Sequence, residues 1–76
     1  MNTFQDRLRE LRRQMNLTQK KLADVLQTTN SSICDWECGR SEPDLTQLVQ
    51  IAKIFDVSTD FLLGLEDETG AKLFSI

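Results

Sequence analysis

The sequence predicts an all-α fold, a compact domain of five helices. Apolar residues recur at intervals of three and four in successive segments, which is the spacing of amphipathic helices. Residues typical of helix ends separate these segments, and no alternating pattern of β-strands appears in them. The chain has 76 residues, of which 39% are hydrophobic and 28% charged, and this suits one small globular domain.

The first helix is expected at about residues 3–15 and the second directly after Thr18. One apolar stripe marks the first helix: Phe4, Leu8, Leu11 and Met15. Asn16 is expected to end it. Thr18 is a good N-cap, and Leu17 and Leu22 stand where a hydrophobic staple forms. The inner face of the second helix is expected to comprise Leu22, Ala23, Val25 and Leu26.

The third helix is expected to begin after Thr29 and to end at Gly39, with residues 27–29 forming the turn before it. Ile33 and Trp36 are its buried candidates. Its first turns are dominated by small polar residues: Thr28, Thr29, Asn30, Ser31 and Ser32. Short polar side chains of this kind suit a helix that enters the major groove of DNA, where they meet base edges and phosphates.

The fourth and fifth helices are each predicted from an N-cap. Asp44 with Gln47 three residues later reads as a capping box, and Ser58 caps a short last helix that Gly64 ends. The apolar stripe of the fourth helix is expected to be Leu45, Leu48, Ile51, Ala52 and Phe55, and the buried candidates of the fifth are Phe61, Leu62 and Leu63.

The sequence divides into a domain at residues 1–64 and a C-terminal tail at residues 65–76. The tail has an acidic run, Glu66 to Glu68, a bend at Gly70, and the apolar residues Leu73, Phe74 and Ile76. Three alternatives stay open for these apolar residues: folding back on the domain, contacting a second subunit, or disorder.

Charge is divided unequally along the chain. Residues 1–40 carry seven basic and five acidic side chains, a net charge of +2, whereas residues 41–76 carry two basic and seven acidic ones, a net charge of −5. One basic face and an acidic back would suit docking onto phosphates in one orientation. A solvated helical surface of mixed charge is the alternative.

Several classes of function have little support. The chain has no histidine, no nucleophile motif and no glycine-rich phosphate loop, so an enzyme is not expected, and neither a cofactor nor a small-molecule effector is evident. Cys34 and Cys38 are read as ordinary reduced thiols rather than a metal site or disulfide, although oxidation sensing by Cys34 stays open. With no membrane span and no secretory signal, the cytoplasm is the expected location.

Five short motifs in fixed order resemble the Cro/CI-type helix-turn-helix repressors, also called the XRE family. The resemblance covers about residues 4–64. The motifs are Arg7-x-Leu-Arg-x-x-Arg12, Leu17-Thr-Gln-x-x-Leu-Ala23, Ser32-Ile-x-x-Trp-Glu-x-Gly39, Pro43-x-Leu-x-x-Leu48 with Ile51-Ala52, and Val57-Ser-x-Asp-x-Leu-Leu-Gly64. Each motif alone is weak evidence for the family, but all five in this order and at this spacing are strong evidence.

The resemblance implies a lambda-repressor-like domain in which the second and third helices form the helix-turn-helix. It implies a sequence-specific DNA-binding regulator of a bacterium or phage, expected to be a repressor. Such a protein would bind a two-fold operator in double-stranded DNA as a homodimer. An antitoxin or another protein-interaction module is the alternative. The implied DNA-binding residues are Thr18, Gln19, Lys20, Thr29, Asn30, Ser31, Ser32, Asp35 and Arg40.

Within that set, the resemblance places Gln19 on a phosphate and Asn30, Ser31 and Asp35 near base edges. It also implies a structural pair, Arg12 with Glu37, that ties the first helix to the third. The sequence departs from the family at two positions. Gln27 stands where glycine is common, so the turn would hold a left-handed glutamine, and Asp35 stands where Arg or Lys is frequent, which lowers attraction to DNA.

Overall fold

The computed structural model describes residues 3–67 and 69–72. It contains α1 (Phe4–Gln14), α2 (Gln19–Leu26), α3 (Asn30–Cys38), α4 (Leu45–Phe55) and α5 (Thr59–Leu62). The only paired extended backbone in this part of the chain is an isolated bridge between Glu66 and Lys72. The all-α, five-helix prediction is therefore confirmed. In the described residues, no helix is long and apolar enough to cross a membrane.

Four helices begin where the capping residues predicted them, whereas α1 and α5 end at Gln14 and Leu62, slightly before the predicted Asn16 and Gly64. The side chains of Thr18, Thr29 and Ser58 each accept a hydrogen bond from the backbone N–H three residues later. Asp44 and Gln47 form the full capping box at the start of α4. These bonds satisfy N–H groups that have no partner inside the helix, so local sequence alone determines where four of the five helices begin.

A single hydrophobic core joins the helices. The side chains with no exposed surface are Leu8, Leu22, Ile33, Ile51 and Leu62, one from each helix. Trp36 is also buried, as predicted, and Leu17 packs against the core at the entry to α2. Because every helix contributes one fully buried residue, the core holds α2 and α3 in one orientation relative to the other three.

Four residues predicted to be apolar contacts are instead exposed. Met15 is 51% exposed, Val25 49%, Leu45 80% and Leu63 50%. Met15 and Leu63 lie just past the last turn of α1 and α5, where the chain leaves the helical path. Leu45 is the first residue of α4 and lines an open surface hollow, and Val25 lies at the edge of the apolar stripe of α2. Helical spacing gave the correct face but overestimated its width and length.

The segment after α5 returns to the domain. Arg7 is only 4% exposed, and its Nη1 donates to the backbone carbonyls of Phe61 and Glu66 while the guanidinium lies 4.2 Å from the ring centroid of Phe61. Lys72 pairs with Asp60 and Glu66. Through Glu66 and Lys72, the described part of the segment after α5 contacts the domain. Glu68, Leu73, Phe74 and Ile76 lie outside the described residues.

Candidate nucleic-acid interface

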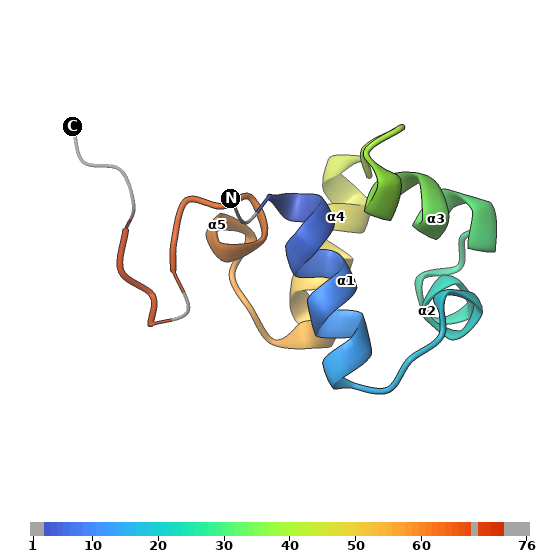
Figure 1. Ribbon diagram of the computed structural model, residues 1–76, viewed down its shortest axis with the longest axis horizontal. Coiled ribbons are helices and arrows are strands. Elements are labelled where there is room, and N and C mark those ends of the chain that lie inside the picture. Colours follow the sequence, from blue (N-terminus) through green and yellow to red (C-terminus); the bar gives the residue numbers. More distant parts are fainter. Residues whose placement is uncertain (1–2, 68, 73–76) are drawn as a thin grey trace.

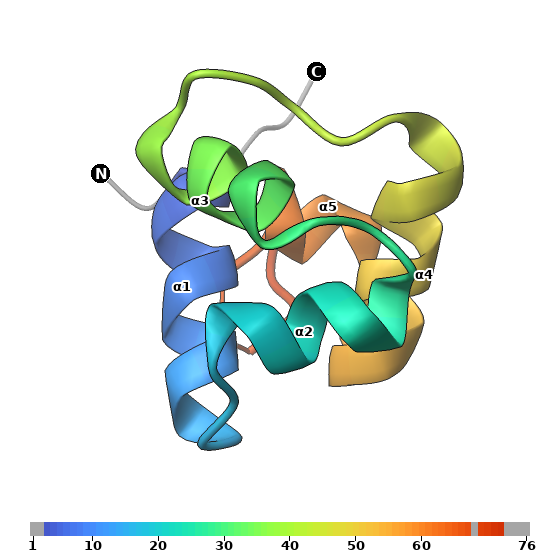
Figure 2. The same ribbon diagram turned by 90° about the vertical axis from the view of Figure 1, so that its right-hand side faces the viewer.

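Helices α2 and α3 lie together at one end of the molecule. They occupy the right-hand end in Figure 1 and face the viewer in Figure 2, with α1 and α4 on either side behind them. The predicted turn between them is present. Gln27 adopts the left-handed conformation at φ 56°, and the Thr28 N–H bonds to the Ala23 carbonyl at 2.9 Å. The unusual Gln27 therefore makes the turn that glycine would make.

The solvent-facing side of α3 is polar. Asn30 and Ser31 are exposed and Asp35 is partly exposed, whereas Ile33, Trp36 and Glu37 face the core. Residues four apart share a helix face, so Ser31 and Asp35 lie one above the other. The three residues expected near base edges thus all lie on the solvent-facing side of α3.

Two predicted contact residues have hydroxyl groups that already act in the cap of α3. Thr29 Oγ1 accepts the Ser32 N–H at 3.1 Å, and the Thr29 and Ser32 hydroxyls lie 2.9 Å apart. Similarly, Thr18 Oγ1 accepts the Lys21 N–H at 3.0 Å. These side chains set the start of each helix, and Thr18 and Thr29 remain exposed at the surface.

Asp35 and Arg40 are paired. Arg40 Nη1 lies 3.5 Å from Asp35 Oδ1, and the Arg40 N–H donates to the Asp35 carbonyl at 2.9 Å. The Arg40 side chain is 73% exposed, so the ion pair is open to solvent. Such a pair is weak and can open, but while it is closed it reduces the positive charge next to the polar face of α3.

Glu37 is the buried centre that holds this end of the molecule together. Its carboxylate accepts two bonds from Arg12, from Nε at 2.7 Å and from Nη2 at 3.0 Å, so the implied pair is present in the structure. Hydrogen bonding to Glu37 raises the pKa of the Arg12 guanidinium. A third Arg12 nitrogen donates to the Leu17 carbonyl at 2.8 Å, which also ties down the entry to α2.

Two further residues join Glu37 that sequence reasoning did not place there. Gln19 Nε2 donates to Glu37 Oε1 at 3.2 Å, and Arg9 Nη2 donates to the Glu37 carbonyl at 2.6 Å. Gln19, expected on a phosphate, is therefore partly engaged inside the protein. The sequence did offer one signal: a carboxylate buried on α3 needs several hydrogen-bond donors, so residues other than Arg12 had to donate to Glu37. Lys20, by contrast, is 81% exposed and makes only a 3.9 Å pair with Asp24.

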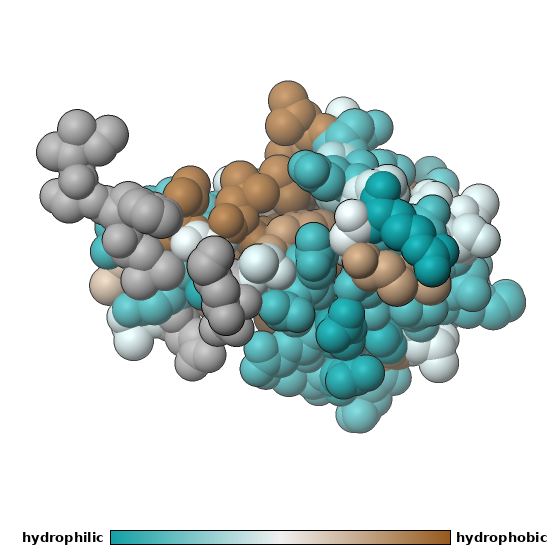
Figure 3. All heavy atoms as spheres, turned by 45° about the horizontal axis from the view of Figure 1, so that its top comes forward, coloured by the Kyte–Doolittle hydropathy of each residue, from teal (hydrophilic) through white to brown (hydrophobic). Residues whose placement is uncertain are grey.

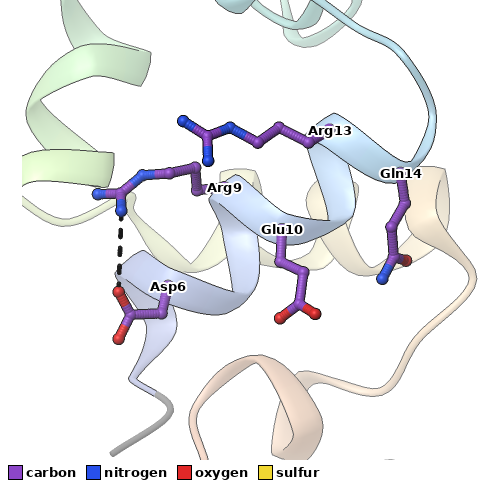
Figure 4. Close-up of a pocket in the computed structure, with 5 residues that line it drawn as sticks. All are labelled: Asp6, Arg9, Glu10, Arg13 and Gln14. Carbon is purple, nitrogen blue, oxygen red and sulfur yellow. Dashed lines mark ion pairs between the residues drawn. The ribbon is translucent and has the colours of Figure 1, made fainter.

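A shallow hollow beside α1 does not form a second site. Figure 4 shows its five lining residues, with Arg9 and Arg13 extending from one side of the helix and Glu10 and Gln14 from another. Asp6 and Arg9 form an ion pair at 4.0 Å. The hollow is open, and its charges are mixed, so it lacks the enclosed apolar walls of a small-molecule site.

A helix-turn-helix family model matches residues 8–62, and this chain belongs to that helix-turn-helix family. The chain is 39% identical over 67 residues to a protein of Bacillus subtilis (strain 168) named as the uncharacterised helix-turn-helix-type transcriptional regulator YobD. The match covers 88% of this chain and 60% of that protein. The chain thus spans less than two thirds of the length of this relative.

Among solved structures, the chain superposes on a repressor bound to DNA and also on part of an enzyme. The P22 c2 repressor in complex with a synthetic operator superposes with a TM-score of 0.78 and 27% identity, covering 83% of this chain and 96% of that one. The iron enzyme HppE, in its FeII form, also superposes, with a TM-score of 0.73 and 30% identity over 86% of this chain but only 36% of its own. The fold therefore occurs both in repressors and as part of a larger enzyme.

Proposed function

We propose that this chain is the DNA-binding domain of a transcriptional regulator and reads a specific sequence through the exposed face of α3. The observation that carries the proposal is the presentation of Asn30, Ser31 and Asp35 on one outward face, held by the buried Glu37 cluster. The P22 c2 repressor, a structural neighbour, is crystallised on an operator. The likeness to the enzyme HppE is not matched by a comparable arrangement of side chains for catalysis in the described residues.

In the proposed complex, α3 lies in the major groove and α2 crosses the backbone. The amide of Asn30 can bond an adenine at N6 and N7, whereas Ser31 can donate or accept and discriminates less. Asp35 accepts only, so it suits the N4 amino group of cytosine. Lys20 and the N–H groups at the start of α2 contact phosphate, and Gln19 joins them once its bond to Glu37 opens.

We infer that the domain acts as a homodimer on a two-fold site and represses by occupancy. Exposed apolar side chains gather on one face, visible as the brown region in Figure 3. Two exposed residues, Leu45 and Leu63, line one surface hollow together with Phe4, Pro43 and Leu48. The rest of its lining is polar or glycine: Thr3, Gln5, Gly39, Ser41 and Glu42. An apolar patch at the end of α3 supports pairing of two copies, with half-sites about 34 Å apart.

Binding-site selection from a randomised duplex library tests the proposal. The purified chain should enrich one sequence with two-fold symmetry, and its affinity for that duplex should fall steeply with salt. Replacing Leu45 and Leu63 by serine should weaken dimerisation in sedimentation and lower affinity for the full site more than for a half-site. Absence of any enriched sequence would contradict the proposal.

A protein-interaction module is the second candidate. The net charge of −3 and the Asp35–Arg40 pair favour it, because both reduce attraction to phosphates. This candidate predicts weak binding without sequence preference in the selection experiment, together with a stable complex with a protein partner.

A further inference from the structure

The exposed face of α3 also carries two thiols that the proposed reading of DNA does not use. Cys34 is partly exposed and Cys38 is exposed, and both are free. Their Sγ atoms lie 4.0 Å apart, one helical turn from each other. The chain has 2 cysteines in total, so both are in this pair.

Oxidation to a disulfide is poorly supported by this arrangement. A disulfide bond is about 2.05 Å long and needs closer Cβ atoms than two positions in an intact helix supply, so the last turn of α3 would have to open. Hydrogen bonding to Cys38 raises the pKa of the Cys34 thiol, which reduces the thiolate that oxidants attack.

The same separation suits one soft cation held between the two sulfurs. A metal–thiolate bond is about 2.3 Å long for zinc, so two sulfurs 4.0 Å apart can both reach a single ion. Zinc itself requires four ligands, and the part of the chain that the structure describes has no group of three or more candidate ligands. Thiolates select soft ions such as Cu(I), for which two sulfurs suffice.

We propose that Cys34 and Cys38 form a two-thiolate site for a soft, thiophilic monovalent cation of the Cu(I) type. Binding deprotonates both thiols and releases two protons. The cation and two thiolates then form a complex with a net charge of −1, where two neutral thiols stood before. No electron is transferred, and the cation is the only species added.

The regulatory consequence rests on the proposed function. Asn30, Cys34 and Cys38 follow one another at intervals of four, so the bound ion lies on the face of α3 that carries Asn30. A negatively charged complex at that place repels phosphates, and the ion occupies space where the DNA would contact α3. Loading the site should therefore release the protein from DNA.

Titration with Cu(I) alone, without oxygen and against a chromophoric Cu(I) chelator, tests the site without DNA. The reduced chain should take one ion, and both Cys34→Ser and Cys38→Ser should lose this binding while their circular dichroism stays helical. A matched control is Ser31→Cys/Cys34→Ser, which keeps two thiols on the same face but places them about 10.5 Å apart along the helix. It should also lose binding.

The opposite results are distinct. The intrahelical site would be overturned if a single-serine variant or the matched control still bound the ion. It would also be overturned if one ion were shared by two chains. A second measurement compares binding of the selected duplex by metal-free and Cu(I)-loaded protein. Loss on loading is expected, and unchanged affinity would overturn the regulatory consequence. Failure of the metal-free protein to bind DNA would instead count against the proposed function.

Discussion

Arg12 and Glu37 connect α1 to α3 through two charge-assisted hydrogen bonds, at 2.7 and 3.0 Å. The Glu37 side chain is only 3% exposed and that of Arg12 12%, so water competes little for either group. Through Gln19 the same carboxylate also contacts α2. One buried acidic side chain thus joins the hydrophobic core in fixing the orientation of the helix-turn-helix relative to α1.

Replacing Glu37 by glutamine should strongly destabilise the domain. The change leaves the partly buried Arg12 guanidinium without its counter-charge, and breaking a largely buried pair of this kind costs about 3 kcal/mol. Urea unfolding measures the loss, with Glu10→Gln, an exposed residue of α1, as the control. An unchanged midpoint would show that Glu37 does not anchor α3. The double variant Arg12→Met/Glu37→Leu should recover part of the loss.

Replacing Gln27 by glycine should stabilise the domain slightly. A non-glycine residue in the left-handed region costs about 1–2 kcal/mol, and glycine removes this strain while adding entropy to the unfolded chain, which offsets part of the gain. We expect a net gain of about 0.5 kcal/mol. Thermal unfolding of Gln27→Gly beside Gln27→Ala checks this. A lower melting temperature for the glycine variant would mean that the Gln27 side chain contributes a contact of its own.

The segment after α5 should make stability depend on acid pH through Asp67. Hydrogen bonds from the Thr69 side chain and the backbone of Ala71 and Thr69 lower the pKa of Asp67. Its contribution is therefore present above the ordinary aspartate pKa of about 3.9 and is lost as the pH falls through the lowered value. The wild type should unfold at a higher temperature than Asp67→Asn at pH 7, and this difference should shrink in acid. A difference independent of pH would contradict the assignment.

Replacing Asp35 by asparagine should increase affinity for DNA of any sequence. The change removes a negative charge from the face of α3 and frees Arg40, which lies 3.5 Å away, for a phosphate. The slope of log K against log salt should steepen by about one, as expected for one more phosphate contact. Asp56→Asn serves as the control, because Asp56 is exposed at the end of α4 and forms no ion pair in the described residues. Equal slopes for Asp35→Asn and wild type would show that the pair does not restrain Arg40.

What could be predicted from the sequence depends on how far apart in the sequence the interacting residues lie. Caps at Thr18, Thr29, Asp44 and Ser58 depend on residues three positions apart, so they were predicted correctly. The left-handed turn at Gln27 was expected from the family resemblance. The exposure of Leu45 and Leu63 was missed, because helical spacing does not say where a neighbouring helix stops.

Long-range contacts explain what was missed at the candidate site. Arg7 is buried because carbonyls of Phe61 and Glu66, more than fifty positions away, accept its hydrogen bonds. Similarly, Gln19 looked like a free phosphate contact, since nothing local indicates that Glu37 points toward α2. Which surface residues touch DNA stays a prediction, since it depends on a partner rather than on the chain's own packing.

The most direct test of the central claim is the affinity of Asn30→Ala for its selected duplex and for random duplex at one salt concentration. If the exposed face of α3 reads bases, specific binding should weaken by about 1–3 kcal/mol while random binding stays the same, and one base preference should relax. Lys20→Ala should instead weaken both by a similar factor. Equal losses on the two duplexes for Asn30→Ala would contradict the account.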